Sequence, residues 1–399
     1  MDVELRPLGE DDLEQVIHVR ATSYGPVADR QRTLQSLGWR MPYSLGAFVG
    51  GRLRSMSFMF PLAAWVGGRK TTVAGLSGVA TAPEARRQGL VARSLRRWFA
   101  LLHDQGIGWS AEHPFDPTFY ARLGYQTVPN GHTLELPPAR LRASTRAGPG
   151  RSEGIVAEPV GAEAVADMAR VHAAFASRFS FALARDDGLK DHWAWTLRRP
   201  WEPLAQFAYA AEDAYAVFTV KEPEKEDGDT VLHVRDLAWS SPAGRRRVFA
   251  LLAGYEGQVG AVRLHLPAGD PVALDWSAWH TVESPELQVR VVDVKVALEG
   301  LTWPEEARLT LRVADPDCDW NDGTFALELG PGGAGVARAD AAEPDAALDV
   351  GALAALLTGA SPPASLLTDG RAEGSLPALR ALAGALREHP VFKSHNDHF

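Results

Sequence analysis

A strand, a tight turn and a helix follow one another directly around residue 85. The small and β-branched residues from Gly75 to Ala82 predict a short buried strand. Pro83 ends this strand, because proline cannot donate to a hydrogen-bonded ladder. After a turn at residues 86–89, we expect a helix over residues 90–104. Its apolar side chains recur on one face: Val91, Leu95, Trp98, Phe99 and Leu102. This order of elements predicts an α/β unit.

The turn has the features of an anion-binding site. The first N–H groups of a helix have no partner inside the helix, and the helix dipole favours negative charge there. Gly89 has no Cβ, so a phosphate can approach the backbone closely, and Arg86 and Arg87 add positive charge. An ordinary strand–turn–helix with a solvated arginine pair explains the same residues about equally well, because a single glycine turn is a weak motif.

Two segments resemble those of the GNAT acetyltransferases. Residues Val79–Pro83 followed by Arg86–Val91 are similar to the family's acetyl-CoA motif, which reads Arg/Gln-x-x-Gly-x-Gly/Ala after a strand. The match breaks at Val91, where the family prefers glycine or alanine. Phe119–Tyr125 resembles the Phe-Tyr-x-x-x-Gly-Tyr segment that follows the next strand in the family.

The whole chain of 399 residues resembles the Eis (enhanced intracellular survival) group in its length, in the order of its parts and in its C-terminal Phe399. The resemblance implies an α/β (α+β) chain with two tandem GNAT-like acetyltransferase domains and a sterol-carrier-like α/β domain. We therefore expect a catalytic domain over residues 1–145. A degenerate second GNAT-like domain would follow over residues 146–285, and the sterol-carrier-like domain over residues 286–399.

Further predicted elements bear on these boundaries. We expect the strand at residues 133–136 to close the first domain and the strand at residues 289–294 to begin the third. The third domain would continue with strands at 307–314 and 324–329 and an apolar helix at 348–357. Two roles stay open for this domain: it binds a lipid in an apolar tunnel, or it is structural and buries only its own core.

A second copy of the strand–turn–helix pattern lies near residue 242. When Pro242 is matched to Pro83, an arginine pair again follows, and Val248 takes the place of Gly89. The valine side chain would fill the space through which a phosphate approaches, so we predict that the second domain has lost its cofactor turn. A chance similarity between arginine-rich turns is the alternative explanation.

Charge and cysteine content narrow the function classes. The formal net charge of −9 argues against nucleic acid as the main partner and suits a cationic substrate. The single cysteine, Cys318, excludes an intrachain disulfide and a cysteine-based zinc site, and the scattered histidines suggest no metal. No run approaches the ~18 apolar residues of a membrane span. Residues 1–6 lack a signal-peptide pattern, so we expect a cytoplasmic protein.

The resemblance implies acetyl-CoA as the cofactor. The backbone of Val79 and Thr81 would pair with the pantetheine arm as a neighbouring strand does. The amides from Arg87 to Ala92 would hold the pyrophosphate. The complete set of cofactor-binding residues that the resemblance implies is Val79, Ala80, Thr81, Arg86, Arg87, Gln88, Gly89, Leu90, Val91 and Ala92.

Two groups are expected to move protons. A tyrosine phenol has a pKa of about 10, above the value of about 8.5 for a thiol, so Tyr120 is protonated at neutral pH and can donate to a leaving sulfur. In the Eis group the matching tyrosine is the general acid; a tyrosine that only packs beside its helix is the alternative. The group also implies that the terminal carboxylate of Phe399 is the general base, whereas a frayed terminus is the default for any chain.

The expected acceptor is an amine. The family implies aminoglycosides, with lysine side chains and polyamines as further acceptors. Asp29 and Asp116 are candidates for attracting a cationic substrate, and Trp39 and Phe58 are candidates for walls of its pocket. Solvated loop charges and core packing are the commoner fates of such residues. Eis-like proteins assemble as hexamers, so we expect a homo-oligomer.

A non-catalytic protein is the alternative function, in which the chain binds CoA, or a lipid through its C-terminal domain. The turn from Arg86 to Gly89 is intact in the first domain, and Tyr120 follows it. These two features together favour the enzyme.

Overall fold

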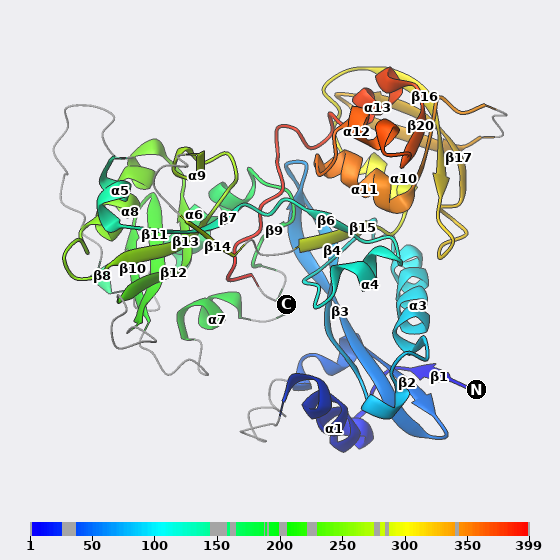
Figure 1. Ribbon diagram of the computed structural model, residues 1–399, viewed down its shortest axis with the longest axis horizontal. Helices are drawn as coiled ribbons and strands as arrows, with labels where there is room; N and C mark the ends of the chain where they lie inside the picture. Colours follow the sequence, from blue (N-terminus) through cyan, green and yellow to red (C-terminus); the bar gives the residue numbers. More distant parts are fainter. Residues whose placement is uncertain are drawn as a thin grey trace.

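The protein is built on three β-sheets, seen in a computed structural model that describes residues 2–25, 37–143, 158–159, 165–186, 188–189, 191–198, 206–221, 230–274, 280–283, 287–339 and 343–397. Figure 1 shows two lobes: the first and third sheets lie together in one lobe, and the second sheet forms the other. The C-terminal segment runs between the lobes. The predicted α/β class is confirmed.

The first sheet has eight strands among the described residues. Its order is β1 (Glu4–Arg6), β2 (Ser44–Val49), β3 (Arg52–Val66), β4 (Arg69–Thr81), β5 (Trp109–Glu112), β15 (Leu287–Val291) and β6 (Gln126–Val128), with β9 (Ala182–Leu183) beside β3. Strands β4 and β5 run parallel, and the other neighbours run antiparallel. This arrangement places the end of β4 next to the helix that follows it.

Among the described residues, three helices accompany the first sheet: α1 (Leu13–Tyr24), α3 (Leu90–Asp104) and α4 (Pro117–Ala121). Helix α3 has the predicted bounds and the predicted apolar face, since Leu95, Trp98, Phe99 and Leu102 are buried while its arginines are exposed. A period of 3.6 residues puts these four side chains on one side of the helix, which therefore packs on the sheet.

The second sheet has the order β14 (His280–Glu283), β7 (His132–Leu136), β13 (Ala261–Leu266), β12 (Val231–Trp239), β11 (Ala214–Lys221), β10 (Phe207–Ala211) and β8 (Glu158–Pro159). Its helices are α5 (Pro138–Ala143), α6 (Val165–Ala176), α7 (His192–Arg198), α8 (Pro242–Ala253) and α9 (Pro271–Leu274). A separate hydrophobic core fills this lobe. The predicted order of strand and helix around residue 242 is confirmed by β12 and α8.

Two strands pair in a different sheet from the one that the sequence suggested. Strand β7, expected to close the first domain, pairs with β13 and β14 in the second sheet. Strand β15, expected to begin the third domain, lies between β5 and β6 in the first sheet. All five residues of β15 are buried, so this strand belongs to the middle of a sheet. The chain therefore crosses between the lobes from β6 to β7 and from β14 to β15 to complete both sheets.

The third sheet has the order β18 (Gly333–Arg338), β17 (Gly323–Gly330), β16 (Ala307–Ala314), β19 (Ala346–Asp349) and β20 (Ala372–Gly374). Its helices are α10 (Val294–Glu299), α11 (Val350–Thr358), α12 (Pro363–Thr368) and α13 (Leu376–Leu382). The predicted strands at 307–314 and 324–329 and the apolar helix at 348–357 are confirmed to within two residues. Every residue of α11 is buried, in a core that the first and third sheets share.

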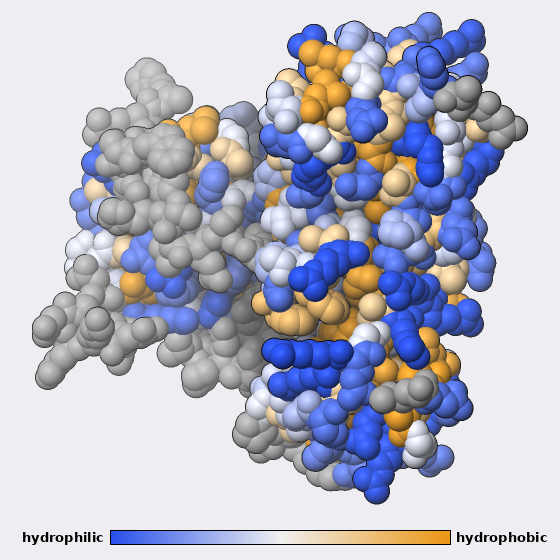
Figure 2. Space-filling model, turned by 45° about the vertical axis from the view of Figure 1, so that its right-hand side comes forward, coloured by the Kyte–Doolittle hydropathy of each residue, from blue (hydrophilic) through white to orange (hydrophobic). Residues whose placement is uncertain are grey.

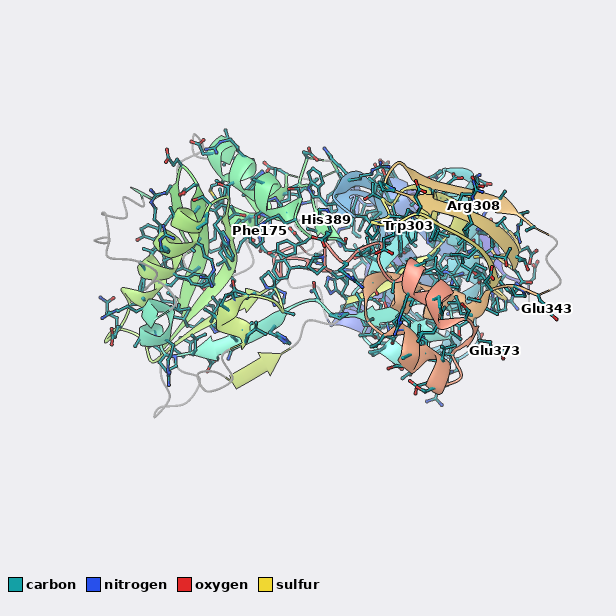
Figure 3. The ribbon with its side chains drawn as sticks, turned by 90° about the horizontal axis from the view of Figure 1, so that it is seen from above. Phe175, Trp303, Arg308, Glu343, Glu373 and His389 are labelled. Carbon is teal, nitrogen blue, oxygen red and sulfur yellow. The ribbon has the colours of Figure 1, made fainter. Side chains whose placement is uncertain are left out.

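The tail beyond α13 returns to the second lobe. Figure 3 shows His389 between the lobes, with Phe175 of the second lobe on one side and Trp303 on the other. Val391 bridges to Ser180, and the ring of Phe392 stacks on His265 with centroids 5.0 Å apart. The last described residues, Asn396 and Asp397, are both buried.

The visible surface is mixed in polarity. Figure 2 shows hydrophilic residues over most of the face formed by the first and third sheets, with hydrophobic residues in small groups. Among the described residues, no helix combines the length and the hydropathy that a bilayer crossing requires.

Candidate active site

Strands β4 and β5 separate at the place where the site forms. They pair only from Val73 to Leu76 on β4, although β4 continues to Thr81. Gly78 has a φ of +58°, and the register with β3 shifts at this point. A Cβ on Gly78 would lie 2.6 Å from the Phe58 ring, so the bulge needs glycine. Within the described residues, no strand covers the β5 side of β4 beyond Leu76. Among these residues, the carbonyls of Val79 and Thr81 accept only side-chain hydrogen bonds there, from Tyr24 and Arg86, which a ligand can replace.

The turn after β4 directs backbone amides outward. A short 3-10 turn at Pro83–Ala85 leads to Arg87 and Gly89, which have φ values of +61° and +73°. Gly89 is the N-cap of α3; it gives no side-chain cap, and the first turn of α3 has no acidic residue. The N-terminal amides of this 15-residue helix therefore keep their capacity to bind an anion.

Two side chains of the turn stabilise its conformation by hydrogen bonds to backbone carbonyls. The Arg86 guanidinium donates to the carbonyl oxygens of Thr81 (3.3 Å) and Thr22 (3.1 Å). The Gln88 amide donates to the Glu84 carbonyl oxygen at 3.0 Å. Arg86 thus joins the turn to the end of α1, and its charge still lies at the cavity wall.

A cavity of about 790 Å³ opens over this turn. Most of the predicted cofactor residues line it, together with residues from the end of α1 and from α4. The lining is formed by Ser23, Tyr24, Val79, Thr81, Ala85, Arg86, Arg87, Gln88, Gly89, Leu90, Val91, Ala92, Phe115, Asp116, Phe119 and Arg122. Ala80 is the exception to the prediction: it is buried, and its carbonyl accepts from Ser55 on the opposite edge of β4.

Two strongly exposed aromatic residues at the cavity were not predicted. Tyr24 and Phe115 are 55% and 73% exposed, unusual for large apolar side chains, and both line the cavity. The Tyr24 hydroxyl donates to the Val79 carbonyl at 2.9 Å. Tyr24 approaches β4 only through the fold, so no local sequence signal could have identified it.

Tyr120 lies directly behind the cavity wall. It is carried by α4 and is only 2% exposed, and it does not itself line the cavity. The rings of Phe115 and Phe119 stand edge-on to the Tyr120 ring, with centroids at 5.6 and 5.0 Å. Burial, with the charge of Glu112, raises the pKa of the Tyr120 phenol well above its usual value. The phenol therefore holds its proton at neutral pH.

Asp116 holds α4 in place. Its carboxylate caps the helix, accepting from the amides of Thr118 (2.9 Å) and Phe119 (3.3 Å) and from the Thr118 hydroxyl (2.6 Å). These hydrogen bonds, first the one from the Thr118 hydroxyl, lower the pKa of Asp116. Asp116 thus lines the cavity, where the sequence analysis had named it as a pocket candidate, and it is also an N-cap, which was not predicted.

The other predicted site residues have different fates. Phe58 is 1% exposed, stacks on Phe60 and packs in the core, so it does not line this cavity. Trp39 is partly buried and also packs on Phe60, with centroids 5.0 Å apart. Asp29 and Phe399 lie outside the described residues.

Between β12 and α8, which the structure describes completely, the second domain has no comparable turn. Helix α8 begins at Pro242 immediately after β12, and its N-cap Ser241 accepts from the Gly244 amide at 2.9 Å. Val248 is buried in the helix interior, so its match to Gly89 was wrong. The loop is missing, rather than blocked by a valine. Arg245 pairs with Asp270, and the start of α8 is already capped by the protein itself.

Three family models match this chain. An acetyltransferase (GNAT) domain model matches residues 4–128, another acetyltransferase (GNAT) domain model matches residues 182–291, and a sterol carrier protein domain model matches residues 294–393. The chain therefore contains two GNAT acetyltransferase domains. The first of these domains contains the uncapped turn and the cavity, and acetyl-CoA is therefore the cofactor of this acetyltransferase.

The acetyltransferase is similar to uncharacterized N-acetyltransferases of Streptomyces. One from Streptomyces avermitilis is 26% identical over an alignment of 415 residues including gaps, and the alignment covers 96% of each chain. One from Streptomyces coelicolor is 28% identical over 356 residues, covering 82% of this chain and 79% of that relative.

Solved structures share the whole architecture of the acetyltransferase. A GCN5-related N-acetyltransferase from Kribbella flavida is 26% identical with a TM-score of 0.80, and both chains are covered completely. Eis1 from Mycobacterium abscessus is 19% identical with a TM-score of 0.79, again over both complete chains. The fold that the sequence resemblance implied is therefore confirmed.

The turn fits acetyl-CoA by its own geometry. A Cβ added to Gly89 would meet no protein atom within 4 Å, so the space above this residue is open to a ligand. Arg86, Arg87 and Arg122 line the same cavity, and positive charge suits a diphosphate. Among the described residues, no group of histidine, cysteine and carboxylate side chains is arranged to hold a metal ion.

Proposed function

We propose that this protein transfers an acetyl group from acetyl-CoA to a primary amine of a cationic acceptor. An aminoglycoside-like molecule is the proposed acceptor class, with lysine side chains and polyamines as further members. The observation that carries the proposal is the uncapped start of α3 at Gly89, which opens into the cavity beside the helix of Tyr120.

The proposed binding roles follow from the backbone groups of the β4 edge and of the α3 turn, which no neighbouring strand or helix cap covers among the described residues. Residues Val79 and Thr81 are proposed to pair with the pantetheine arm, because the β5 side of β4 has no strand there among the described residues. The amides from Arg87 to Ala92 are proposed to hold the diphosphate, with the Arg87 guanidinium beside them. When bound, acetyl-CoA supplies the acetyl group as an activated thioester.

Tyr120 is the proposed general acid. Burial and the charge of Glu112 raise the pKa of its phenol, so the proton stays on Oη until a negative sulfur forms nearby. The apolar rings of Phe115 and Phe119 would also raise the pKa of the leaving thiol. The pKa values of the proton donor and of the sulfur that accepts the proton therefore rise together. Asp116 contributes by capping the helix that carries Tyr120.

The terminal carboxylate of Phe399 is the proposed general base. The amine of the acceptor must lose a proton before it can attack, and a carboxylate removed from water becomes a stronger base. The tail supports this role because it is docked between the lobes, and its last described residues, Asn396 and Asp397, are buried.

The acceptor class rests on charge. The chain carries a formal net charge of −9, and the carboxylates of Glu112 and Asp116 both act electrostatically on Tyr120. Negative charge near the reacting centre favours a cationic acceptor. We further propose a cytoplasmic homo-oligomer, a hexamer by resemblance to the Eis group, which sedimentation analysis tests directly.

Thiol release from acetyl-CoA tests the proposed function. The assay uses a panel of aminoglycosides, polyamines and lysine peptides, with Tyr120→Phe and a chain extended beyond Phe399 as variants. Tyr125→Phe is the matched control, because the Tyr125 hydroxyl bonds the Ser110 hydroxyl in the core at 2.7 Å. We expect amine-dependent release that falls at least tenfold in both variants and stays near wild type in the control. Absence of turnover with every amine would instead indicate a CoA- or lipid-binding protein.

A further inference from the structure

One short segment, residues 180–185, holds the C-terminal tail. The Ser180 hydroxyl donates to the His389 carbonyl at 2.7 Å, and its amide donates to the Pro390 carbonyl at 2.9 Å. The Phe392 amide returns to the Ser180 carbonyl at 3.1 Å. The tail is therefore tied by backbone and side-chain hydrogen bonds on both sides of Val391.

The same segment is attached to the first sheet. Strand β9 within it pairs with β3, and the Phe181 and Ala184 amides donate to the carbonyls of Trp65 (2.6 Å) and Ala63 (2.8 Å). Strand β3 is the hairpin partner of β4, which carries the cofactor edge. The position of the tail is consequently fixed relative to the strand on which the thioester is proposed to lie.

Arg185 closes this segment with a buried ion cluster. Its Nε donates to Asp397 Oδ1 at 2.7 Å, while Nη1 and Nη2 donate to the two oxygens of Asp236 at 2.7 and 3.1 Å. The three side chains are at most 3% exposed. Arg185 has a φ of +58°, a strained conformation for a residue other than glycine, which persists where the surroundings fix it.

Further partners complete the cluster and belong to the second lobe or to the tail. The hydroxyls of Tyr215 and Ser394 each donate to Asp236 at 2.8 Å. The Lys393 ammonium donates to the Asp397 carbonyl, and the Asn396 amide donates to the Thr196 hydroxyl at 2.9 Å. A free chain terminus normally frays. The number of specific hydrogen bonds here indicates that the tail is held in one defined position.

We propose that Arg185 is a positioning residue for acetyl transfer: through Asp397 it fixes the last residues of the chain, and so the terminal carboxylate, relative to the first sheet. This inference rests on the proposed function, in which that carboxylate is the base. The inference also assigns a function to the second domain. That domain has no cofactor turn between β12 and α8, and it holds the C-terminal tail so that the terminal carboxylate reaches the first domain.

Two substitutions at Asp397 separate positioning from folding. Asp397→Asn keeps an oxygen for Arg185 Nε and places the amide where Oδ2 has no hydrogen-bond partner within the described residues, so it is the mild variant. Asp397→Ala removes the contact and leaves Arg185 paired with Asp236. Glu388→Ala is the matched control, because Glu388 is an exposed carboxylate of the same tail.

The kinetic expectation is specific to a displaced base. A misplacement of about 1 Å can cost about 100-fold in rate, so kcat should fall about 100-fold in Asp397→Ala and less in Asp397→Asn. The KM for acetyl-CoA should not change. The deficit should shrink above pH 9, where the acceptor amine increasingly loses its proton without help. A purely structural role for Arg185 would not produce this pH-dependent recovery.

A carboxypeptidase assay tests the Arg185–Asp397 contact without using enzymatic activity. The folded full-length chain is treated with the protease, and mass spectrometry follows the release of Phe399. We expect fast release from Asp397→Ala, intermediate release from Asp397→Asn, and slow release from wild type and Glu388→Ala. Equal release from all four proteins would overturn the inference. If release differs as expected but the wild-type protein without Phe399 keeps its full kcat, the proposed general base is wrong. The conclusion that Arg185 holds the tail through Asp397 would then remain valid.

Discussion

The hydroxyl of Tyr24 donates a hydrogen bond to the Val79 carbonyl at 2.9 Å, on the open edge of β4. In a strand, the N–H and C=O of one residue face the same side, so both groups of Val79 point to the place where a ligand would pair. The Tyr24 hydroxyl therefore occupies a hydrogen bond that the pantetheine arm needs. Because Tyr24 is 55% exposed, water readily replaces the bond when the side chain moves.

Removal of the Tyr24 hydroxyl should strengthen CoA binding. We expect Tyr24→Phe to lower the Kd of CoA about threefold, because a bond of about 0.5–1 kcal/mol no longer competes with the ligand. Isothermal titration calorimetry measures this change. Tyr43→Phe, a partly buried tyrosine that packs on Phe60, serves as the control and should keep the wild-type Kd. Weaker binding by Tyr24→Phe would show that the hydroxyl contacts the ligand instead.

Gly89→Ala should lose cofactor binding beyond any loss of stability. The φ of +73° makes alanine unfavourable by about 1 kcal/mol, and the new Cβ enters the open space above the turn. Gly106→Ala is a close control, because Gly106 has a φ of +68°, equally open surroundings and a place at the opposite end of α3. Both variants should melt at similarly reduced temperatures, but only Gly89→Ala should raise the Kd of CoA, by at least tenfold. A parallel loss of binding in Gly106→Ala would contradict the account.

Asp116→Ala should affect both stability and rate. Loss of an N-cap costs about 0.5–2 kcal/mol in free energy of unfolding, and here the helix that loosens carries Tyr120. We expect a several-fold lower kcat together with the destabilisation. Asp349→Ala removes another N-cap, which accepts from the Ala352 amide at 2.7 Å at the start of α11. Chemical denaturation and steady-state kinetics should find similar destabilisation in this control with an unchanged kcat.

Stability should fall as the pH is lowered from 6.5 to 4. Burial, followed by the charge of Arg185, lowers the pKa of His172 to about 4, and burial, followed by the charge of His395, lowers that of His265 to about 3. Both histidines titrate at about 6.5 in an unfolded chain, so within this window the unfolded state binds more protons and is favoured.

His233 adds to this dependence, because burial, followed by the charge of Lys221, lowers its pKa to about 3. Three such groups imply a slope of roughly 3 kcal/mol per pH unit in the free energy of unfolding, measured by urea denaturation. Substitution His265→Gln should reduce the slope by about a third. His18→Gln, at an exposed position, should leave it unchanged. A flat profile in the wild-type protein would show that the three imidazoles are solvated.

Local features of this fold were predictable from the sequence. The 3.6-residue spacing of Leu95, Trp98 and Leu102 identified α3 to the residue, and the turn around Gly89 has the positive φ that its glycine suggested. These features depend on contacts within a few residues, which a sequence pattern records directly.

Strand pairing was not predictable in the same way. The apolar run of β15 suits the middle of any sheet, so the sequence does not say that it inserts between β5 and β6. The match of Val248 to Gly89 failed for a related reason. It aligned prolines, whereas the physically equivalent points are the starts of α8 and α3.

The parts of the site that the sequence missed are also non-local. Tyr24 and Val79 are 55 residues apart, and Arg185 and Asp397 are 212 residues apart, so only the folded chain joins them. Asp116 and Phe58 were chosen for their chemical type, but the fold uses the first as a helix cap and the second to pack against Gly78.

A crystal structure of the full chain with CoA tests the central claim most directly. The account predicts one coenzyme per chain, with its diphosphate on the amides from Arg87 to Ala92 and its thiol next to Tyr120. A coenzyme bound at the start of α8 near Ser241, or none at the α3 turn under saturating ligand, would contradict it.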